Sequence, residues 1–212
     1  SICKSMIESK IYPDFISVDG GEGGTGAAPL EYSNSVGMPL RDGLSFVDDC
    51  LRGFGIREHI KISASGKVIT GFHIMRNIAL GADFTSSARA MMLALGCIQA
   101  LDCNKNTCPT GITTQDKSLM KGLDVANKSI RIFKYHVETI HSVKDLLSAT
   151  GKKLDALNRT DINRRISQLS VKTYNQIYPT IANEDFLNGN IPEYLKEDYL
   201  VSSSDSFLSK NI

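Results

Sequence analysis

The sequence lacks tryptophan altogether and has only four histidines and six prolines among its 212 residues. It also lacks an excess of charge, because 24 basic and 23 acidic residues leave a net charge of +1. Without a basic block it has no electrostatic footprint for a nucleic acid. No apolar run reaches the roughly 20 residues that span a bilayer, and the start, SICKSMIESK, lacks the apolar core of a signal peptide. We therefore expect a cytoplasmic protein with no nucleic-acid or membrane partner.

Five cysteines, an odd number, argue against a secreted disulfide framework and leave room for metal or redox chemistry. Cys3 and Cys50 stand apart in the sequence, and we expect them to be core or surface residues. The histidines share no metal-like spacing and are interpreted as ordinary surface or helix residues.

Three short apolar or β-branched segments predict buried strands at residues 14–18, 60–64 and 82–86. Helical patterns over 45–52 and over 71–82, with Gly81 as a stop, separate them. This alternation is typical of parallel α/β units, in which ligand chemistry lies at the carboxyl ends of the strands. The fold class is therefore α/β.

The run ARAMMLALGCIQAL, residues 88–101, is apolar almost all round and predicts a buried helix. A further helix, ending near Gly151 and packing on one side, is predicted by a stripe of apolar residues at helical spacing: Ile130, Phe133, Val137, Ile140 and Leu147. From Lys152 onward glycine is scarce and polar residues dominate. We expect residues 1–150 to form the body and residues 151–212 a partly extended segment that wraps it.

The stretch ASGKVITG places Gly66 and Lys67 between a predicted strand and a predicted helix. Backbone N–H groups in such a turn often face a phosphate, and the helix dipole favours negative charge there. A plain strand-to-helix turn beside a solvated lysine is the alternative.

Three cysteines, Cys97, Cys103 and Cys108, follow the pattern C-x5-C-x4-C, with Pro109 after the last. Thiolates gathered in a short turn-rich segment are soft ligands for iron or zinc, and a Cys-Pro end is common in iron–sulfur ligand runs. A structural zinc would want a fourth ligand, which no nearby histidine offers. Three buried cysteines without a metal are the alternative.

The loop SVDGGEGGTGAAP follows the first predicted strand and has five glycines within seven positions. Glycine lets backbone approach a planar or anionic ligand closely. The loop also contains Asp19 and Glu22, and its place at the end of a strand favours an active-site loop over a merely flexible one. The two carboxylates are candidates for orienting or protonating a substrate, or for satisfying N–H groups of the loop.

DGGEGGTGAAP, SGKVITG followed by ALGAD, and ALGC-x5-C-x4-CPTGITTQD occur in this order. The set resembles the C-terminal part of the FMN-binding domain of glutamate synthase, and most closely the stand-alone FMN-binding proteins of that family. The likeness runs from about Pro13 through the late segments RRIS, YNQIYP and IPEYL.

The resemblance implies a (β/α)8 barrel carrying FMN and the reduction of 2-iminoglutarate to glutamate. It implies a 3Fe-4S cluster on Cys97, Cys103 and Cys108. It also implies that the FMN phosphate meets Gly66 and Lys67 together with backbone N–H groups near Ser87, Ala88 and Arg89. Glutamate synthases proper have a Gly-Thr pair in place of Ala88 and Arg89, and Arg89 could itself pair with phosphate.

A complete barrel needs eight strands and typically ~250 residues, whereas only three strands are predicted here. We therefore expect the C-terminal part of a TIM (β/α)8 barrel with a helical and extended C-terminal segment, which needs the N-terminal half of the barrel for activity. An electron donor, either a protein or a reduced pyridine nucleotide system, and a small-molecule substrate are implied. Because these residues include no amino-terminal cysteine nucleophile domain, we do not expect this chain to release ammonia from glutamine. A non-catalytic barrel fragment or binding module without cofactor is the alternative function.

Overall fold

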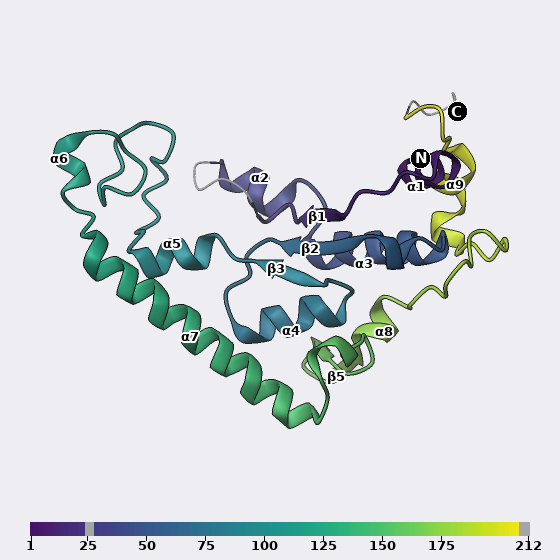
Figure 1. Cartoon of the computed structure of the whole chain (residues 1–212). Helices are drawn as coiled ribbons and strands as arrows, with labels where there is room; N and C mark the ends of the chain where they lie inside the picture. The colour runs from purple at the N-terminus through teal and green to yellow at the C-terminus, as the bar shows by residue number, and fades with distance from the viewer. Residues whose placement is uncertain (24–27, 208–212) are drawn as a thin grey trace.

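The computed structural model of the chain describes residues 1–23 and 28–207. Its centre is a three-stranded parallel sheet (Figure 1). The strands are β1 (Phe15–Asp19), β2 (Lys61–Ser65) and β3 (Phe84–Ser86), and they lie side by side in chain order. All three predicted strands are found, with starts shifted by one or two residues. Their predicted burial is right for β2 but wrong for β1 and β3, where Phe15 and Phe84 are exposed. The chain is therefore a mixed α/β protein with a parallel sheet.

The two faces of this sheet differ in chemistry. Ile62 and Ala64 of β2 are fully buried, in one hydrophobic core with residues of α3 (Leu40–Gly53) and α4 (Gly71–Ala79). Both helices lie on the same side of the sheet (Figure 1). The register pairs Asp19 with Ser65 and Ser65 with Ser86, so these three side chains share the opposite face at the carboxyl end.

The helices that follow β1 and β2 form where the pattern predicts them. α3 begins before the predicted residue 45, because Leu40 and Leu44 extend its buried stripe to Leu51. The hydroxyl of Thr70 caps α4 by accepting a hydrogen bond from the His73 N–H. α4 ends just before Gly81, whose φ of 119° agrees with the predicted stop.

The buried helix predicted for residues 88–101 is only partly right. α5 spans Arg89–Leu95 and stops at Gly96, which takes a left-handed φ of 113°. Among the α5 residues only Ala90 is buried, and Ile98 beyond the helix is 67% exposed. The apolar run therefore continues into a loop rather than into another turn of helix.

The long helix α7 (Val125–Thr150) ends at Gly151 as predicted and packs against α4 and α5. The predicted stripe is wrong in its first half, because Ile130 and Phe133 are 56% and 67% exposed. Val143 is instead the buried residue of α7. The smaller helices are α1 (Ile2–Ser9), α2 (Leu30–Ser35), α6 (Lys117–Met120), η1 (Arg57–His59) and η2 (Leu154–Ala156).

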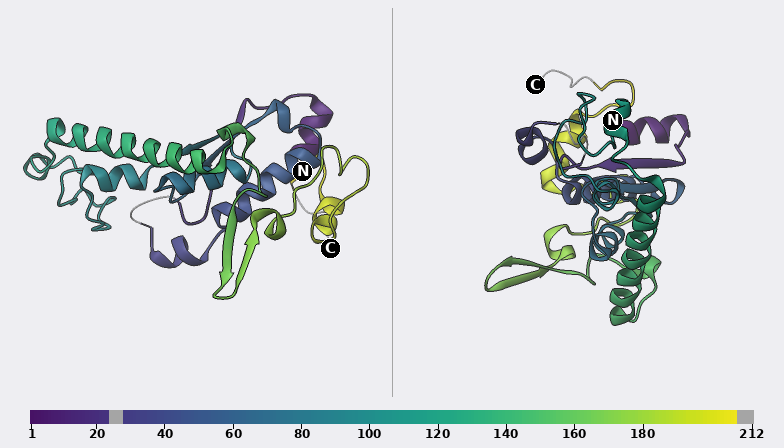
Figure 2. Two further views of the ribbon diagram at one scale, coloured as in Figure 1. Left: turned by 90° about the horizontal axis from the view of Figure 1, so that it is seen from below. Right: turned by 90° about the vertical axis from the view of Figure 1, so that its left-hand side faces the viewer.

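The C-terminal segment contains the hairpin of β4 (Asn163–Ser167) and β5 (Ser170–Thr173), then α8 (Tyr174–Ile177) and α9 (Glu193–Val201). Figure 2 shows the hairpin projecting from the rest of the molecule. α9 returns to the N-terminal helix α1 (Figure 1), where Lys4 Nζ donates to the carbonyls of Tyr199 and Ser202 at 2.7 and 2.9 Å. Within residues 1–23 and 28–207 no helix is both long and apolar enough to cross a membrane.

A buried charge cluster joins this segment to α3. Arg159 is 3% exposed, and its guanidinium lies 3.1 Å from Asp48 Oδ2 and 2.9 Å from Asp49 Oδ1. Asp48 also accepts hydrogen bonds from Nε of Arg52 and of Arg57, at 2.9 and 2.8 Å. Three arginines therefore pair with the buried Asp48 carboxylate. Without these partners, burial of its negative charge would cost a large amount of free energy.

Replacing Arg159 should strongly destabilise the fold. Arg159→Met leaves Asp48 and Asp49 in the interior without their shared partner, and breaking such a buried pair typically costs about 3–5 kcal/mol. Arg165→Met is the matched control, because Arg165 is exposed and makes no ion pair among the described residues. Urea unfolding of both variants measures the difference. A loss below about 1 kcal/mol for Arg159→Met, the level typical of surface pairs, would contradict this account of the cluster.

Asp83 should make stability depend on pH. Burial raises the pKa of Asp83, but hydrogen bonds from the Ile62 N–H and Arg57, each 2.8 Å, outweigh it and leave the pKa below its usual value. The stability from Asp83 is therefore present above the unfolded pKa of about 4 and lost as pH falls through the folded value. We expect Asp83→Asn to be less stable than the natural protein at pH 7 and this gap to narrow on acidification. Urea unfolding from pH 7 to pH 3 tests this, and a gap that stays constant would contradict it.

Candidate functional site

Three adjoining cavities lie around the carboxyl ends of the strands. The first encloses about 30 Å³, the middle one about 260 Å³ and the third about 20 Å³. Lys67, Ala88 and Arg89 line both the first and the middle cavity. Cys97 and Cys103 line both the middle cavity and the third. The predicted anion-binding residues and the predicted metal ligands thus share one continuous wall.

The first cavity lies between the turn after β2 and the start of α5. Gly66 and Lys67 form this turn with φ of 142° and 46°, and a Cβ on Gly66 would lie 3.4 Å from the Gly20 nitrogen. In the described part of the chain the backbone N–H groups of Gly66, Lys67, Ala88 and Arg89 donate no hydrogen bond. These free N–H groups, with two cationic side chains on the same wall, give the cavity the chemistry of an anion site.

Ser87, unlike Ala88 and Arg89, does not line a cavity at this end of the sheet. Its hydroxyl donates to the Val68 carbonyl at 2.6 Å, and Ser87 lines none of the three cavities. The side chain therefore ties the start of α5 to the turn after β2, which holds the two walls of the first cavity together.

The two predicted acidic residues also differ. Glu22 lines the first cavity, and its Oε2 accepts a hydrogen bond of 2.9 Å from the Leu40 N–H at the start of α3. It therefore satisfies a free donor at a helix terminus. Asp19 is exposed at the end of β1, and its carboxylate makes no hydrogen bond or ion pair within the described ranges. Gly24 and Gly26 of the glycine loop lie outside the described residues.

The third cavity is where the three cysteines meet. Cys97, Cys103 and Cys108 all line it, and all are free thiols. The segment between them is irregular, since Gln99 and Leu101 take positive φ of 57° and 59°. Such backbone costs free energy and is concentrated at ligand sites.

Cys108 differs electrostatically from the cysteines of the core. The hydroxyl of Thr110, 3.3 Å from its sulfur, and then Thr113 lower the pKa of Cys108 to about 6. This lowered pKa favours the thiolate, the form that binds metals. Burial instead raises the pKa of Cys3, and that of Cys50 to about 12. Both pack against the core, which confirms the expectation for these two residues.

The cysteine loop brings three thiols to one cavity without the arrangement that a single metal ion needs. Among the described residues no group of three or more His, Cys, Asp or Glu side chains is close enough to hold one ion. A three-iron cluster makes a different demand, because its thiolates bind separate irons and stand farther apart. Thr113 Oγ1 is buried beside the cysteines without a hydrogen bond of ordinary geometry, as expected of a donor that faces sulfur ligands. The cavity of about 20 Å³ requires the loop to expand around a cluster.

Sequence reasoning missed part of the middle cavity. Leu30, Ser33 and Asn34 of α2 form one wall, and Met92 of α5 forms another. None of them belongs to a glycine, cysteine or charge pattern, so no signal in the sequence alone marks them. The cavity is lined largely by apolar side chains and approaches the size of small-molecule sites, about 300–1,000 Å³.

Together these features define an α/β protein with an anion-type pocket and a cysteine loop at the carboxyl ends of parallel strands. Comparison with known families gives the particular one. Residues 3–153 match the conserved region in glutamate synthase, so the chain belongs to the glutamate synthase family.

Individual relatives agree with this assignment. The chain is 44% identical over 146 residues to the glutamate synthase large subunit-like protein YerD of Bacillus subtilis, an overlap of 69% of this chain and 28% of that protein. It is 38% identical over 138 residues to the archaeal glutamate synthase [NADPH] of Methanocaldococcus jannaschii, covering 65% and 27% of the two chains. It is 31% identical over 163 residues to the glutamate synthase [NADPH] large chain of Azospirillum brasilense, covering 76% and 11%. The matched region thus spans less than a third of each relative.

Substitutions of Glu22 and Asp19 should have different effects on the free energy of unfolding. Glu22→Ala removes the acceptor for the Leu40 N–H, and loss of such a helix-terminal bond should cost about 1 kcal/mol. Asp19→Ala should change stability by less than about 0.5 kcal/mol, because its carboxylate has no partner to lose. Thermal and urea unfolding of both variants provide the measurement. Equal losses in the two variants would contradict the different environments of these carboxylates.

Proposed function

We propose that the chain forms part of an FMN- and iron–sulfur-dependent oxidoreductase that reduces 2-iminoglutarate, formed from 2-oxoglutarate and ammonia, to glutamate. One observation supports this most: the residues proposed for the flavin phosphate and those proposed for the cluster line adjoining cavities at one end of a parallel sheet. Membership of the glutamate synthase family adds independent support.

In this proposal the sheet is a sector of a (β/α)8 barrel. Sequential parallel strands with α3 and α4 on one side are what a barrel requires, whereas a doubly wound sheet has helices on both sides. The opposite face, with Asp19, Ser65 and Ser86 at its carboxyl end, then faces the interior. The remaining strands are supplied outside this sequence, in agreement with its match to less than a third of each relative.

FMN, when bound, supplies hydride transfer, and a 3Fe-4S cluster supplies one-electron transfer from the electron donor, a protein or a reduced pyridine nucleotide system. Lys67 and Arg89 would neutralise the phosphate, and the free N–H groups of Gly66, Ala88 and Arg89 would donate to its oxygens. Apolar side chains of the middle cavity, among them Leu30 and Met92, would exclude water.

The cluster would be held by Cys97, Cys103 and Cys108, with Thr110 and Thr113 donating toward its sulfur atoms. Asp19 is the carboxylate left free to orient or protonate a substrate, since Glu22 already binds the start of α3. The reaction adds one hydride and one proton across the C=N bond of the imine, whose formation releases water.

Cysteine substitutions should test the proposed ligands. Replacing Cys97, Cys103 or Cys108 by serine in the full-length protein should remove most of the iron and the visible absorbance of the cluster, because a three-ligand cluster tolerates no missing thiolate. Cys50→Ser is the matched control and should retain both. Iron analysis and absorption spectra of anaerobically purified protein provide the measurement. Natural iron content in Cys103→Ser would overturn the assignment.

Turnover tests the reaction itself. Photoreduced full-length protein with intact FMN and cluster should be reoxidised anaerobically by 2-oxoglutarate plus ammonia, with glutamate formed in stoichiometric amount. Either compound alone serves as the control and should leave the flavin reduced. Flavin that stays reduced with both compounds present would reject glutamate formation.

A further inference from the structure

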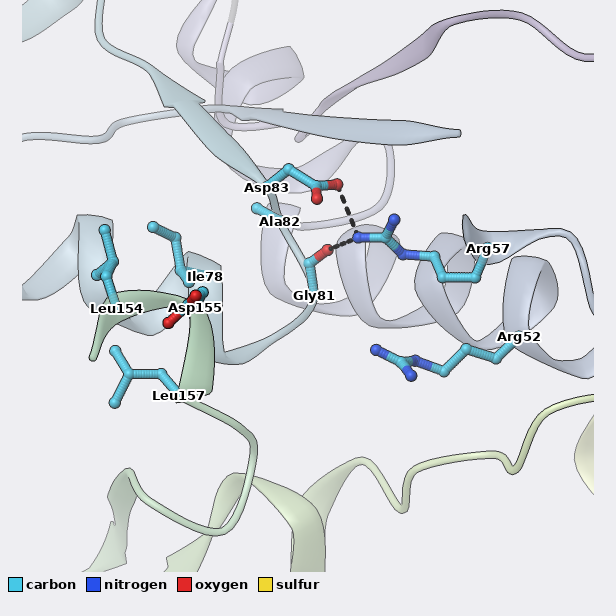
Figure 3. Close-up of a pocket in the computed structure, with 9 residues that line it drawn as sticks. All are labelled: Arg52, Arg57, Ile78, Gly81, Ala82, Asp83, Leu154, Asp155 and Leu157. Atoms are coloured by element: carbon cyan, nitrogen blue, oxygen red, sulfur yellow. Dashed lines mark hydrogen bonds and ion pairs between the residues drawn. The ribbon is translucent and has the colours of Figure 1, made fainter. Parts of the chain in front are cut away.

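A further cavity of about 380 Å³ lies at the other end of the sheet, near the start of β3 (Figure 3). Its charged walls come from Arg52, Arg57, Asp83 and Asp155, and its apolar walls from Ile78, Ala82, Leu154 and Leu157. None of these residues lines the cavities at the carboxyl ends. Its volume falls within the usual range for small-molecule sites, about 300–1,000 Å³.

Two of the four charged residues are already paired with each other. Arg57 donates to Asp83 and to the carbonyls of Gly81 and Ile60, each at 2.8 Å, and its Nε binds Asp48. Figure 3 shows the Arg57 guanidinium against Asp83 and Gly81 at the edge of the cavity. This pair forms a fixed polar wall and has little capacity for a ligand.

Arg52 and Asp155 remain available. Arg52 Nε is fixed at 2.9 Å from the buried Asp48, but its terminal nitrogens make no hydrogen bond in the described part of the chain. The carboxylate of Asp155 has no hydrogen bond or ion pair within the same residues. Although their charges are opposite, the two side chains do not form an ion pair with each other, and Figure 3 shows them on opposite sides of the cavity.

The anchor on Asp48 matters for recognition. Asp48 is 1% exposed and is itself held by Arg57 and Arg159, so the carboxylate that fixes Arg52 cannot move freely. The remaining guanidinium nitrogens are thus presented in a fixed orientation, and such a fork binds a carboxylate in two-point geometry. Preorganisation of this kind lowers the entropic cost of binding.

We propose that this cavity binds a free α-amino acid with an aliphatic side chain. The ligand carboxylate pairs with Arg52, its ammonium group pairs with Asp155, and its side chain contacts Ile78, Leu154 and Leu157. A ligand with both charges satisfies the two unpaired groups at once, which an anion or a cation alone cannot do. This cavity is separate from the proposed flavin and cluster site. A failure of amino-acid binding here would therefore leave the proposed function untouched, and the reverse also holds.

Calorimetric titration of the full-length protein tests this with three matched probes. L-leucine carries both charged groups, 4-methylpentanoate lacks the ammonium group, and 3-methylbutylamine lacks the carboxylate. We expect L-leucine to bind and each of the other two to bind at least about tenfold more weakly, because each leaves one charged group unpaired. The proposal is overturned if L-leucine gives no binding at millimolar concentration, or if it binds no better than either of the two analogues.

Variants assign the two contacts. Asp155→Asn and Arg52→Gln should each weaken L-leucine binding about tenfold or more, whereas the exposed pair Asp145→Asn and Arg165→Gln should leave it unchanged. Asp155 has no partner to lose, so Asp155→Asn should fold even if Arg52→Gln does not. Unchanged L-leucine affinity in Asp155→Asn would exclude this site and show that the amino acid binds elsewhere.

Discussion

The ion pairs of the buried Asp48 carboxylate hold together elements that are far apart in the chain. The carboxylate is almost completely buried in α3 and binds three arginines: Arg52 in its own helix, Arg57 after that helix and Arg159 in the C-terminal segment. Gly81 lies so close that a Cβ there would stand 2.4 Å from the Asp48 carboxyl carbon. One acidic side chain therefore links α3, the start of β3 and the C-terminal segment. In this low-dielectric interior, the loss of any one ion pair would leave a charge without its partner at a high cost in free energy.

This charge cluster lies at the opposite end of the sheet from the cysteine loop. The residues that stabilise the fold are therefore apart from the residues of the candidate site. Parallel strands gather their carboxyl ends at one edge, where loops are free to vary around a ligand, while the amino ends serve stability. Here the carboxyl end has turns with positive φ, free N–H groups and open cavities, as at Gly66 and Lys67. The amino end has salt bridges that fix the helices. Arg52 is the exception, since it is anchored by the cluster and still offers free nitrogens to a cavity.

The sequence predicts the sheet well because its signals are local. Short apolar strands bounded by glycine and the stops at Gly81 and Gly151 depend on neighbours in the chain, and all are found. The faces of α5 and α7 are predicted less well, because which residue is buried depends on what packs against it. Ile130 and Phe133 fit a helical stripe yet are exposed, whereas α4 begins at Gly71 against Ser142 and Val143 of α7.

The candidate site shows the same limit. Glycines, a lysine and spaced cysteines mark its chemistry in the sequence, and these residues do come to adjoining cavities. Their roles in holding FMN and a cluster stay predictions. The wall from α2 and the Arg159 cluster have no sequence signal, because they join segments far apart in the chain. Ser87 and Glu22 resemble ligand residues in the sequence, but their bonds to Val68 and Leu40 depend on how loops meet in space.

The central claim is that one end of this sheet holds FMN and a three-iron cluster side by side. A crystal structure of the full-length protein, purified anaerobically with both cofactors, tests it most directly. The account predicts the flavin phosphate between Gly66, Lys67 and Arg89, and the cluster on Cys97, Cys103 and Cys108 with Thr113 beside its sulfur atoms. A phosphate bound elsewhere, or iron on any other set of side chains, would contradict it.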